Sequence, residues 1–215
     1  MKKLNSKENI NKIVEILDEY YPEAKCGLEY ESPLSLTVSL ILAAQCTDKR
    51  VNVIAPILLK KYPTVEALAS ADVEDIERIV KPCGFYKNKA KNISLMAKKL
   101  EKDFYSKIPD TMDSLTSLNG IGRKSANIIL QECFGKVEGI AVDTHVSRTT
   151  YRMGLTNSKV PLLQEKELIK IIDKKYHSRI NHILVWHGRN MCDARKPKCD
   201  KCPVNSLCLK KDYKA

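Results

Sequence analysis

Apolar residues recur at helical spacing along most of this chain. Near the N-terminus, Ile10, Ile13, Val14 and Leu17 follow the i, i+3, i+4, i+7 pattern, which predicts an amphipathic helix that ends before Pro22. Residues Ser32-Pro33 predict the start of a second, mostly buried helix that runs to about Ala44. The same spacing predicts helices over residues 51–62, with Pro56 as a kink or break, and over 65–69, 73–80, 87–104, 124–134, 144–153, 162–176 and 178–189.

Strand signals are weak by comparison. The best strand candidate is the segment 140–142, Ile-Ala-Val, which is too short to anchor a sheet. No low-complexity linker and no repeat of solenoid period interrupts the chain. The pattern therefore predicts an all-α fold and gives no firm domain boundary.

The net charge of the chain indicates the class of partner to expect. Lys and Arg total 37 of the 215 residues against 26 Asp and Glu, a formal net charge of +11. This excess favours a polyanionic partner, with nucleic acid ahead of an anionic membrane surface. Apolar residues at 43% and charged residues at 29% are typical of a globular protein, so the folded body carries the charge rather than a disordered tail.

Membrane and secretory segments are not expected. The first twenty residues lack the apolar core of a signal peptide, and no window approaches the ~18–20 consecutive apolar residues that a spanning helix needs. We therefore expect a cytoplasmic protein, nucleoid-associated if its source is bacterial or archaeal, with no membrane partner.

Two glycines mark a turn that suits phosphate binding. Gly120 and Gly122 flank Ile121 just before a helix that begins near Arg123. Glycines permit a tight turn and leave backbone N–H groups uncovered, so these amides and the helix N-terminus can hold a phosphate without reading base sequence. An ordinary turn between helices is the alternative. The six lysines of residues 87–102 are a second basic candidate, which a merely solvated helix face also explains.

Lys124 and Asp143 carry the candidate chemistry. Lys124 follows Arg123 in the first helical turn, where the helix dipole and the neighbouring guanidinium disfavour the ammonium and favour the nucleophilic free amine. Asp143 lies nineteen residues later, after a short apolar lead-in and before another helix. Its carboxylate suits the stabilisation of a developing cation or the capping of that helix, and the two roles are compatible.

Eight cysteines fall into two groups. The scattered four are Cys26, Cys46, Cys83 and Cys133, and the clustered four are Cys192, Cys199, Cys202 and Cys208, separated by six, two and five residues. In a cytoplasmic protein, scatter indicates packing and clustering indicates a metal. Because only one C-x2-C pair is present, a cubane iron–sulfur cluster fits better than structural zinc, and zinc with His187 recruited is the alternative.

The loop between the first two clustered cysteines is basic. It contains Arg195, Lys196 and Lys198. A rigid cluster would hold these side chains outwards as phosphate contacts, so binding to a nucleic acid should weaken steeply with salt.

Four segments together resemble a known family. They are the hairpin Leu118–Ala126, the segment Val142–His145, the run His187–Arg189 and the cysteine loop, and Gln45 within Ala44–Asp48 also fits. In this order they are similar to endonuclease III, of the iron–sulfur branch of the helix-hairpin-helix DNA glycosylase superfamily. The resemblance covers nearly the whole chain.

The resemblance implies a two-domain helix-hairpin-helix fold. A six-helix domain is expected over residues 26–136, and a second helical domain over residues 1–25 and 137–215, with one [4Fe–4S] cluster on the four clustered cysteines. A monomer is expected. Two departures from the family pattern are visible: Asn119 stands where the hairpin usually has Pro, and one extra residue lies around Lys136–Gly139.

The resemblance also implies an activity. The family contains bifunctional DNA glycosylases and AP lyases of base excision repair, which act on double-stranded DNA with oxidised or saturated pyrimidines or abasic sites. Lys124 and Asp143 match the catalytic pair, so Lys124 would form a Schiff base and nick the strand 3′ to the abasic site by β-elimination. Gln45 and Phe85 match residues that fill the gap left by the flipped nucleotide, and His145 is an expected DNA contact.

Three rivals are weaker. The adenine-mispair branch uses a glutamate before the Gln, and here no acid lies between Glu31 and Asp48. Thymine-mispair glycosylases more often lack the hairpin lysine. A non-catalytic, cluster-bearing DNA-binding or redox-sensing protein would leave Lys124 and Asp143 as coincidence.

Overall fold

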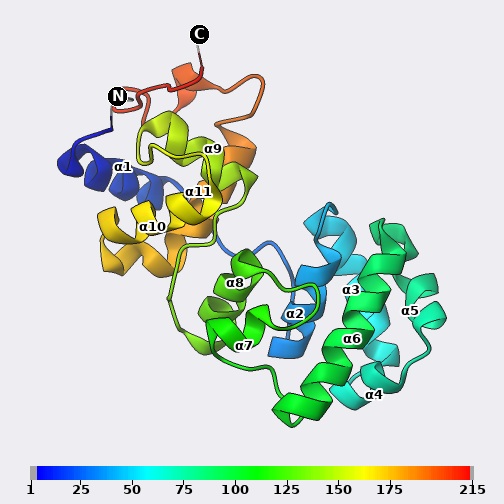
Figure 1. Ribbon diagram of the computed structural model, residues 1–215. Helices are drawn as coiled ribbons and strands as arrows, with labels where there is room; N and C mark the ends of the chain where they lie inside the picture. The colour runs from blue at the N-terminus through cyan, green and yellow to red at the C-terminus, as the bar shows by residue number, and fades with distance from the viewer. Residues whose placement is uncertain (1–3, 214–215) are drawn as a thin grey trace. The chain divides into compact units, whose positions relative to one another are not determined.

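The computed structural model describes residues 4–213, and all regular secondary structure in that range is helical (Figure 1). The α-helices are α1 (Lys7–Tyr20), α2 (Pro33–Leu42), α3 (Asp48–Lys61), α4 (Val65–Ser70), α5 (Val73–Val80), α6 (Tyr86–Phe104), α7 (Met112–Thr116), α8 (Arg123–Phe134), α9 (Thr144–Met153), α10 (Pro161–Ile171) and α11 (His177–Asn190). Short 3-10 helices are η1 (Lys81–Cys83), η2 (Lys174–Tyr176) and η3 (Cys199–Lys201). The predicted all-α class is confirmed. No helix in this range has the length and apolar character that crossing a bilayer requires.

Local sequence explains where most of these helices begin. Seven of them start after a Ser, Thr or Asp whose side chain accepts a hydrogen bond from a first-turn N–H, as Ser6 does from Asn9 and Thr47 from Arg50. Helix α2 has a complete capping box, because the side chains of Ser32 and Ser35 each accept from the other's backbone. The N-cap residues of α6 and α8, by contrast, are Phe85 and Gly122, which make no side-chain capping hydrogen bond.

The chain divides into two compact units, Met1–Cys26 with Val137–Ala215 and Gly27–Lys136. We call them unit 1 and unit 2. In unit 2, α6 packs against α4 and α5 through a face that includes Ile93, Met96 and Leu100. Unit 2 contains seven α-helices rather than the six expected, and it starts one residue later than the expected boundary. The helix that periodicity missed is α7, whose five residues are too few to show a period.

Unit 1 joins α1 to the C-terminal helices around one core. Ile13 and Leu17 of α1 are buried with Ile180 and Ile183 of α11, which packs against α1 and α9. Val204 from the cysteine loop is fully buried in the same core. The core therefore anchors the loop directly.

Two helix predictions need correction: of the kink or break expected at Pro56 the break is absent, and the helix expected over residues 162–176 is shorter. Helix α3 runs through Pro56 without a break, because Val51, Ile54 and Leu58 on both sides of the proline bury one face in unit 2. The helix predicted over residues 162–176 ends at Ile171, and Lys174–Tyr176 form the separate turn η2. Tertiary packing thus outweighs the local signal in α3.

The strand candidate Ile140–Val142 was also wrong. The segment is buried but belongs to no strand. Its backbone is satisfied by a side chain instead, since Asn181 Nδ2 donates to the Ala141 carbonyl at 2.5 Å. The buried segment leads straight to Asp143, as the apolar lead-in suggested.

The basic face expected over residues 87–102 needs one correction. Lys89 is 3% exposed, and its Nζ donates to the Cys83 carbonyl at 2.8 Å. Lys89 therefore belongs to the interior of unit 2 and not to a phosphate-binding surface.

Candidate functional site

The glycine hairpin connects α7 to α8 in unit 2. Its apolar residues Leu118 and Ile121 are both buried, and the Ile121 N–H donates to the Leu118 carbonyl at 3.1 Å, which closes the turn. Asn119, the departure from the family pattern, is exposed in this turn. The two apolar side chains hold the turn to the core, and the polar residues between them face solvent.

Gly120 is required by both its conformation and its packing. Its φ is +82°, in the region that L side chains avoid. A Cβ there would lie 3.1 Å from the Asn92 Cβ and 3.2 Å from the Ile41 Cγ1. The hairpin therefore lies so close to α6 and α2 that a Cβ at position 120 would push the Asn92 and Ile41 side chains aside by a few tenths of an ångström.

Gly120→Ala should destabilise the protein by about 2–4 kcal/mol, since left-handed strain adds to overpacking. Gly122→Ala is the matched control. Gly122 has a φ of −97° and open space around a built Cβ, so we expect a loss within about 1 kcal/mol. Urea denaturation of both variants measures the difference, and equal losses would contradict the packing argument.

The first turn of α8 is open to a ligand. Gly122 supplies no side-chain cap, and Arg123 and Lys124 are exposed. First-turn N–H groups and the positive helix end attract an anion. The amine of Lys124 thus lies where the backbone of unit 2 can bind a phosphate.

Asp143 is the N-cap of α9 in unit 1. Its Oδ1 accepts hydrogen bonds from the His145 and Val146 N–H groups, both at 2.8 Å. The capping role is therefore real. It uses one carboxylate oxygen and fixes the direction of the group, which is half-buried.

His145 is oriented by Arg148 and by the close approach of α11. A Cβ on Gly188 would lie 2.9 Å from the His145 Cβ, so the glycine of the His-Gly-Arg run lets α11 pack onto α9. Arg148 Nη2 contacts His145 Nδ1 at 3.2 Å. Because arginine only donates, Nδ1 accepts and the proton of a neutral imidazole lies on Nε2. Burial lowers the pKa of His145, which favours this neutral form at pH 7.

The four clustered cysteines line one cavity. It is partly open to solvent, and its lining also includes Arg152, Met153 and His187. Burial raises the pKa of Cys202 to about 11, and the neighbouring cysteines add to the effect. Four thiolates gathered here need a positive counter-charge.

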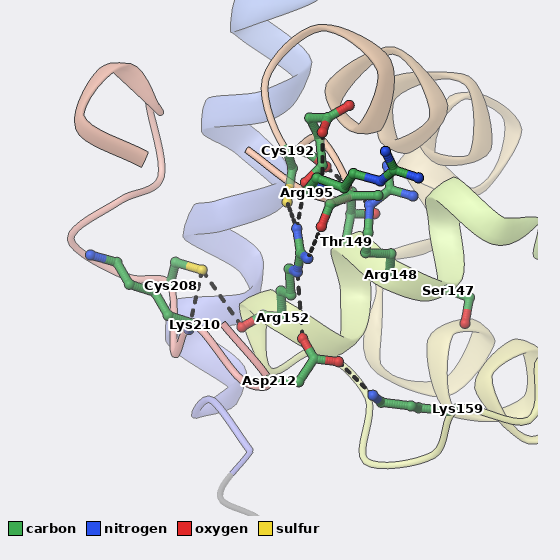
Figure 2. Close-up of polar contacts among 12 residues, drawn as sticks. Ser147, Arg148, Thr149, Arg152, Lys159, Cys192, Arg195, Cys208, Lys210 and Asp212 are labelled. Atoms are coloured by element: carbon green, nitrogen blue, oxygen red, sulfur yellow. Dashed lines mark hydrogen bonds and ion pairs between the residues drawn. The ribbon is translucent and has the colours of Figure 1, made fainter. Parts of the chain in front are cut away.

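Arg152 ties α9 to the start of the cysteine loop (Figure 2). Its guanidinium donates to the carbonyls of Asp193 at 2.7 Å and Ala194 at 2.8 Å, and Nη1 lies 3.7 Å from the Cys192 sulfur. Asp212 pairs with Nε from the other side. Arg148, one helical turn earlier, donates to the Cys192 carbonyl at 3.1 Å. Two arginines at i and i+4 thus fix the backbone around the first cysteine.

Arg152→Met should loosen this loop. The variant removes the donor to the Asp193 and Ala194 carbonyls and leaves Asp212 with Lys159 alone, so we expect a loss of about 1–3 kcal/mol in unfolding free energy. Metal should also be lost several-fold faster to a chelator. Lys159→Met is the control, because exposed Lys159 also pairs with Asp212 and its removal should cost at most about 1 kcal/mol. Equal metal retention in the two variants would contradict the role of Arg152.

His187 lies on the inner side of the loop. It is 1% exposed, its Nδ1 contacts the Tyr21 hydroxyl at 3.2 Å, and its Nε2 lies 3.9 Å from the Cys202 sulfur. Burial lowers the pKa of His187 to about 4, so the ring is neutral at physiological pH. It packs beneath the loop and links it to Tyr21, the residue that follows α1.

An aspartate within the basic loop holds the loop's backbone. Asp193 Oδ1 accepts from the N–H groups of Arg195 and Lys196, whose side chains are exposed. Lys198 is exposed too, but its Nζ donates to the Asn190 carbonyl at the end of α11. The Lys198 side chain is therefore hydrogen-bonded to the backbone, whereas within residues 4–213 those of Arg195 and Lys196 make no such bond.

Gln45 and Phe85 both have a left-handed backbone conformation. Both are non-glycine residues with positive φ, 53° and 46°, and both are exposed, Phe85 by 63%. Such conformations cost energy and gather at functional positions. Both lie in unit 2, in the loops that precede α3 and α6.

Comparison with known proteins settles the family. Residues 38–174 match the HhH-GPD superfamily of base excision DNA repair proteins, and residues 192–208 match the iron-sulfur binding domain of endonuclease III. The chain is 41% identical to Endonuclease III of Synechocystis sp., over 96% of this chain and 94% of the relative. It is 38% identical to Endonuclease III of Bacillus subtilis, over 93% of each. The chain belongs to the endonuclease III family.

Solved endonuclease III structures agree with the fold. One is a trapped endonuclease III–DNA covalent intermediate, with a TM-score of 0.89 and 36% identity over 95% of this chain and 96% of that chain. A non-covalent endonuclease III–DNA complex gives the same TM-score at 35% identity and the same coverage. As an endonuclease III, the chain is a base excision DNA glycosylase with AP lyase activity that binds DNA and carries a [4Fe–4S] cluster.

The cysteine loop fits that cluster. The four cysteines line one cavity, and a cubane cluster takes one thiolate at each of its four irons. The match of residues 192–208 to the iron-sulfur binding domain of endonuclease III confirms the iron–sulfur prediction over the zinc alternative.

The sequence did not lead us to predict a role for Arg148 or Arg152. Helix α9 was predicted, but its arginines were given no role. The available signal was their i, i+4 spacing, which places both on one face of the helix that Asp143 begins.

Proposed function

We propose that this endonuclease III removes oxidised or saturated pyrimidines from double-stranded DNA and nicks the strand 3′ to the abasic site. Exposed Lys124 in the uncapped first turn of α8 carries the proposal. The turn amides and Arg123 offer a phosphate site, so the amine meets the DNA backbone rather than free solvent. A similar protein has been trapped as a covalent DNA intermediate, which supports capture of DNA by such a nucleophile.

The reaction follows from the residue types. Breaking the N-glycosidic bond develops positive charge on the sugar, which the Asp143 carboxylate stabilises electrostatically. The Lys124 amine bonds to C1′ as the base leaves, and one amine proton passes to the base. Cleavage of the C1′–O4′ bond, with the second amine proton passing to O4′, gives an imine with an open sugar. The imine acidifies the C2′ protons, and loss of one of them expels the 3′ phosphate. Hydrolysis of the imine frees the lysine.

We propose that Gln45 and Phe85 fill the gap that the flipped nucleotide leaves in the duplex. Turning a nucleotide out costs a few kcal/mol in unstacking and unpairing, and less at a damaged base. Exposed side chains on left-handed backbone extend from the surface of unit 2 and suit the filling of that gap.

We assign phosphate contacts to both units. In unit 2 these are the amides around Gly120 and Gly122, with Arg123. In unit 1 they are His145, through its Nε2–H, and the basic loop side chains Arg195, Lys196 and Lys198. Because these contacts displace counterions, affinity should fall steeply with salt.

We assign the cluster to Cys192, Cys199, Cys202 and Cys208. When bound, it supplies a covalent cross-link of four loop positions. Arg152 and the Lys210 N–H donate to the sulfurs of Cys192 and Cys208, which stabilises thiolate charge. The basic loop then keeps one shape on the DNA.

A duplex with a single thymine glycol tests this function. The protein should release the base and leave a 3′ nick, and borohydride should trap a covalent protein–DNA adduct. A duplex with thymine at that position is the control and should give neither product. Intact damaged duplex after incubation with folded, cluster-loaded protein would contradict the proposal.

Asp143→Asn separates catalysis from capping. Asn caps a helix as well as Asp does, so stability should stay within about 1 kcal/mol. Loss of the charge should slow base release ~10²–10⁴-fold, while affinity for damaged DNA is kept. Asp72→Asn, at the N-cap of α5, is the matched control and should leave the rate unchanged. Unfolding of Asp143→Asn, or an unchanged rate, would leave Asp143 with a capping role alone.

A further inference from the structure

A buried asparagine of α11 holds the backbone just before Asp143. Asn181 is 4% exposed, and its Nδ2 donates at 2.5 Å to the carbonyl of Ala141, which is also 4% exposed. Both groups are shielded from water, so losing this hydrogen bond would leave a buried carbonyl without its donor. Asp143 follows Ala141 by two residues and caps α9. The bond from Asn181 therefore acts on the segment that leads to the candidate catalytic carboxylate.

Apolar burial alone does not fix the position of this segment along its own axis. Ile140, Ala141 and Val142 are all buried, but they belong to no strand, so no ladder of backbone hydrogen bonds sets their register. Burial is non-directional, whereas a hydrogen bond weakens steeply when its length or angle changes. Asn181 therefore supplies a directional contact that the apolar side chains cannot.

Helix α11 also contacts the chain just after Asp143. Gly188 lies seven residues, about two helical turns, after Asn181, so both residues lie on one face of α11. A Cβ on Gly188 would lie 2.9 Å from the His145 Cβ, which shows how closely this face approaches α9. The N–H of His145 in turn donates to Asp143 Oδ1 at 2.8 Å. One face of α11 thus holds the chain on both sides of Asp143.

The extra residue around Lys136–Gly139 gives this anchor a purpose. It lies in the loop of residues 135–143, which leads from α8 to α9. Lys136, Glu138 and Gly139 are exposed, as expected of a loop that absorbs a change in length. Because Ala141 follows the extra residue, the Asn181 bond fixes the chain after it. The added length then stays in the exposed part of the loop and does not displace Asp143.

We propose that Asn181 is a positioning residue for base release, which holds the Asp143 carboxylate where positive charge develops on the sugar. This inference rests on the proposed catalytic role of Asp143. Asn181 touches no reacting atom and acts only through the Ala141 carbonyl. Electrostatic stabilisation requires a preorganised group, so a carboxylate displaced by about 1 Å should lose roughly 10–100-fold in rate.

Asn181→Leu removes the donor and keeps the approximate size of the side chain. Base release from the thymine glycol duplex, measured in a single turnover with the enzyme in excess, should slow roughly 10–100-fold at a temperature well below the Tm of the variant. Affinity for a duplex with a tetrahydrofuran abasic analogue, which forms no Schiff base, should stay within roughly threefold, because the phosphate contacts are kept. Asn181→Ala removes the same donor without adding volume and replaces Asn181→Leu if that variant does not fold.

Asn5→Leu is the matched control. Asn5 Nδ2 donates to the Met153 carbonyl at 2.7 Å, so this side chain holds the opposite end of α9 in the same way. Its loss should destabilise unit 1 and leave the rate of base release unchanged. Equal slowing in Asn5→Leu and Asn181→Leu would reveal a general effect of destabilisation and overturn the specific role of Asn181.

A double-mutant cycle shows whether Asn181 acts through Asp143. In the Asp143→Asn background the carboxylate charge is already absent, so adding Asn181→Leu should change the rate less than about twofold. A further loss as large as in the wild-type background would overturn the positioning role. A wild-type rate in Asp143→Asn alone would instead overturn the proposed function of Asp143.

Hydrogen exchange gives a readout that does not depend on catalysis. The His145 and Val146 amides donate to Asp143 Oδ1, so their exchange should be at least ~10-fold faster in Asn181→Leu than in the wild type and unchanged in Asn5→Leu. Unchanged exchange in Asn181→Leu would overturn the anchoring of Asp143, whatever the rates show. Faster exchange with a wild-type rate of base release would overturn its consequence for catalysis.

Discussion

Lys124→Arg should abolish the borohydride-trapped adduct and the 3′ nick. The guanidinium keeps the positive charge at the start of α8 but stays protonated and is no nucleophile, so C1′ cannot be captured. We expect the lyase rate to fall at least ~10³-fold, as for other removed nucleophiles. Affinity for the damaged duplex should stay within roughly threefold, because the phosphate contact of a cation is kept.

Two controls make this result specific. Lys107→Arg changes another exposed lysine of unit 2 and should leave the adduct and the nick unchanged. Thermal unfolding of Lys124→Arg should match the wild type, since the side chain is exposed. A trapped adduct at the wild-type level would show that a different amine is the nucleophile.

Cys199→Ser should remove the cluster and with it the shape of the basic loop. Binding of a metal centre contributes directly to folding free energy, so we expect a loss of about 3 kcal/mol or more. Visible absorbance and bound iron should disappear together. Affinity for DNA should fall at least tenfold at moderate salt, because Arg195 and Lys196 lose their fixed positions.

Cys26→Ser is the matched control for that experiment. Cys26 is also half-buried in unit 1 but lies outside the loop, so iron and affinity should be retained. Iron retained by Cys199→Ser would exclude Cys199 from the ligand set. Affinity retained after complete loss of iron would show that the loop contributes nothing to DNA binding.

Local chemistry explains which parts of the fold were predictable. Ser6, Ser32 and Asp143 cap helices that the apolar period already located, so pattern and cap agree. Pro56 misled because the cost of a missing N–H is local, whereas the burial that outweighs it comes from helices distant in sequence. Lys89 misled for a different reason: its partner is the Cys83 carbonyl only six residues earlier, but the burial of both residues is set by the packing of unit 2.

The residues of the candidate site likewise fall into those that local sequence predicts and those that it does not. The hairpin glycines, Lys124 and the four clustered cysteines could be predicted because the residues that define each motif lie close together in the sequence. The left-handed φ of Gly120 agrees with the turn that the sequence predicts, but its close contacts with Asn92 and Ile41 are shown by no local pattern. Arg152 was missed because its partners Asp193 and Asp212 lie 41 and 60 residues away and meet it only in the folded unit.

The position of the covalent bond tests the account most directly. Wild-type protein is incubated with the thymine glycol duplex, reduced with borohydride and digested, and the peptide that carries the sugar remnant is sequenced by mass spectrometry. The account predicts a secondary amine on Nζ of Lys124. A remnant on any other residue, or nick formation with no protein-bound sugar at all, would contradict it.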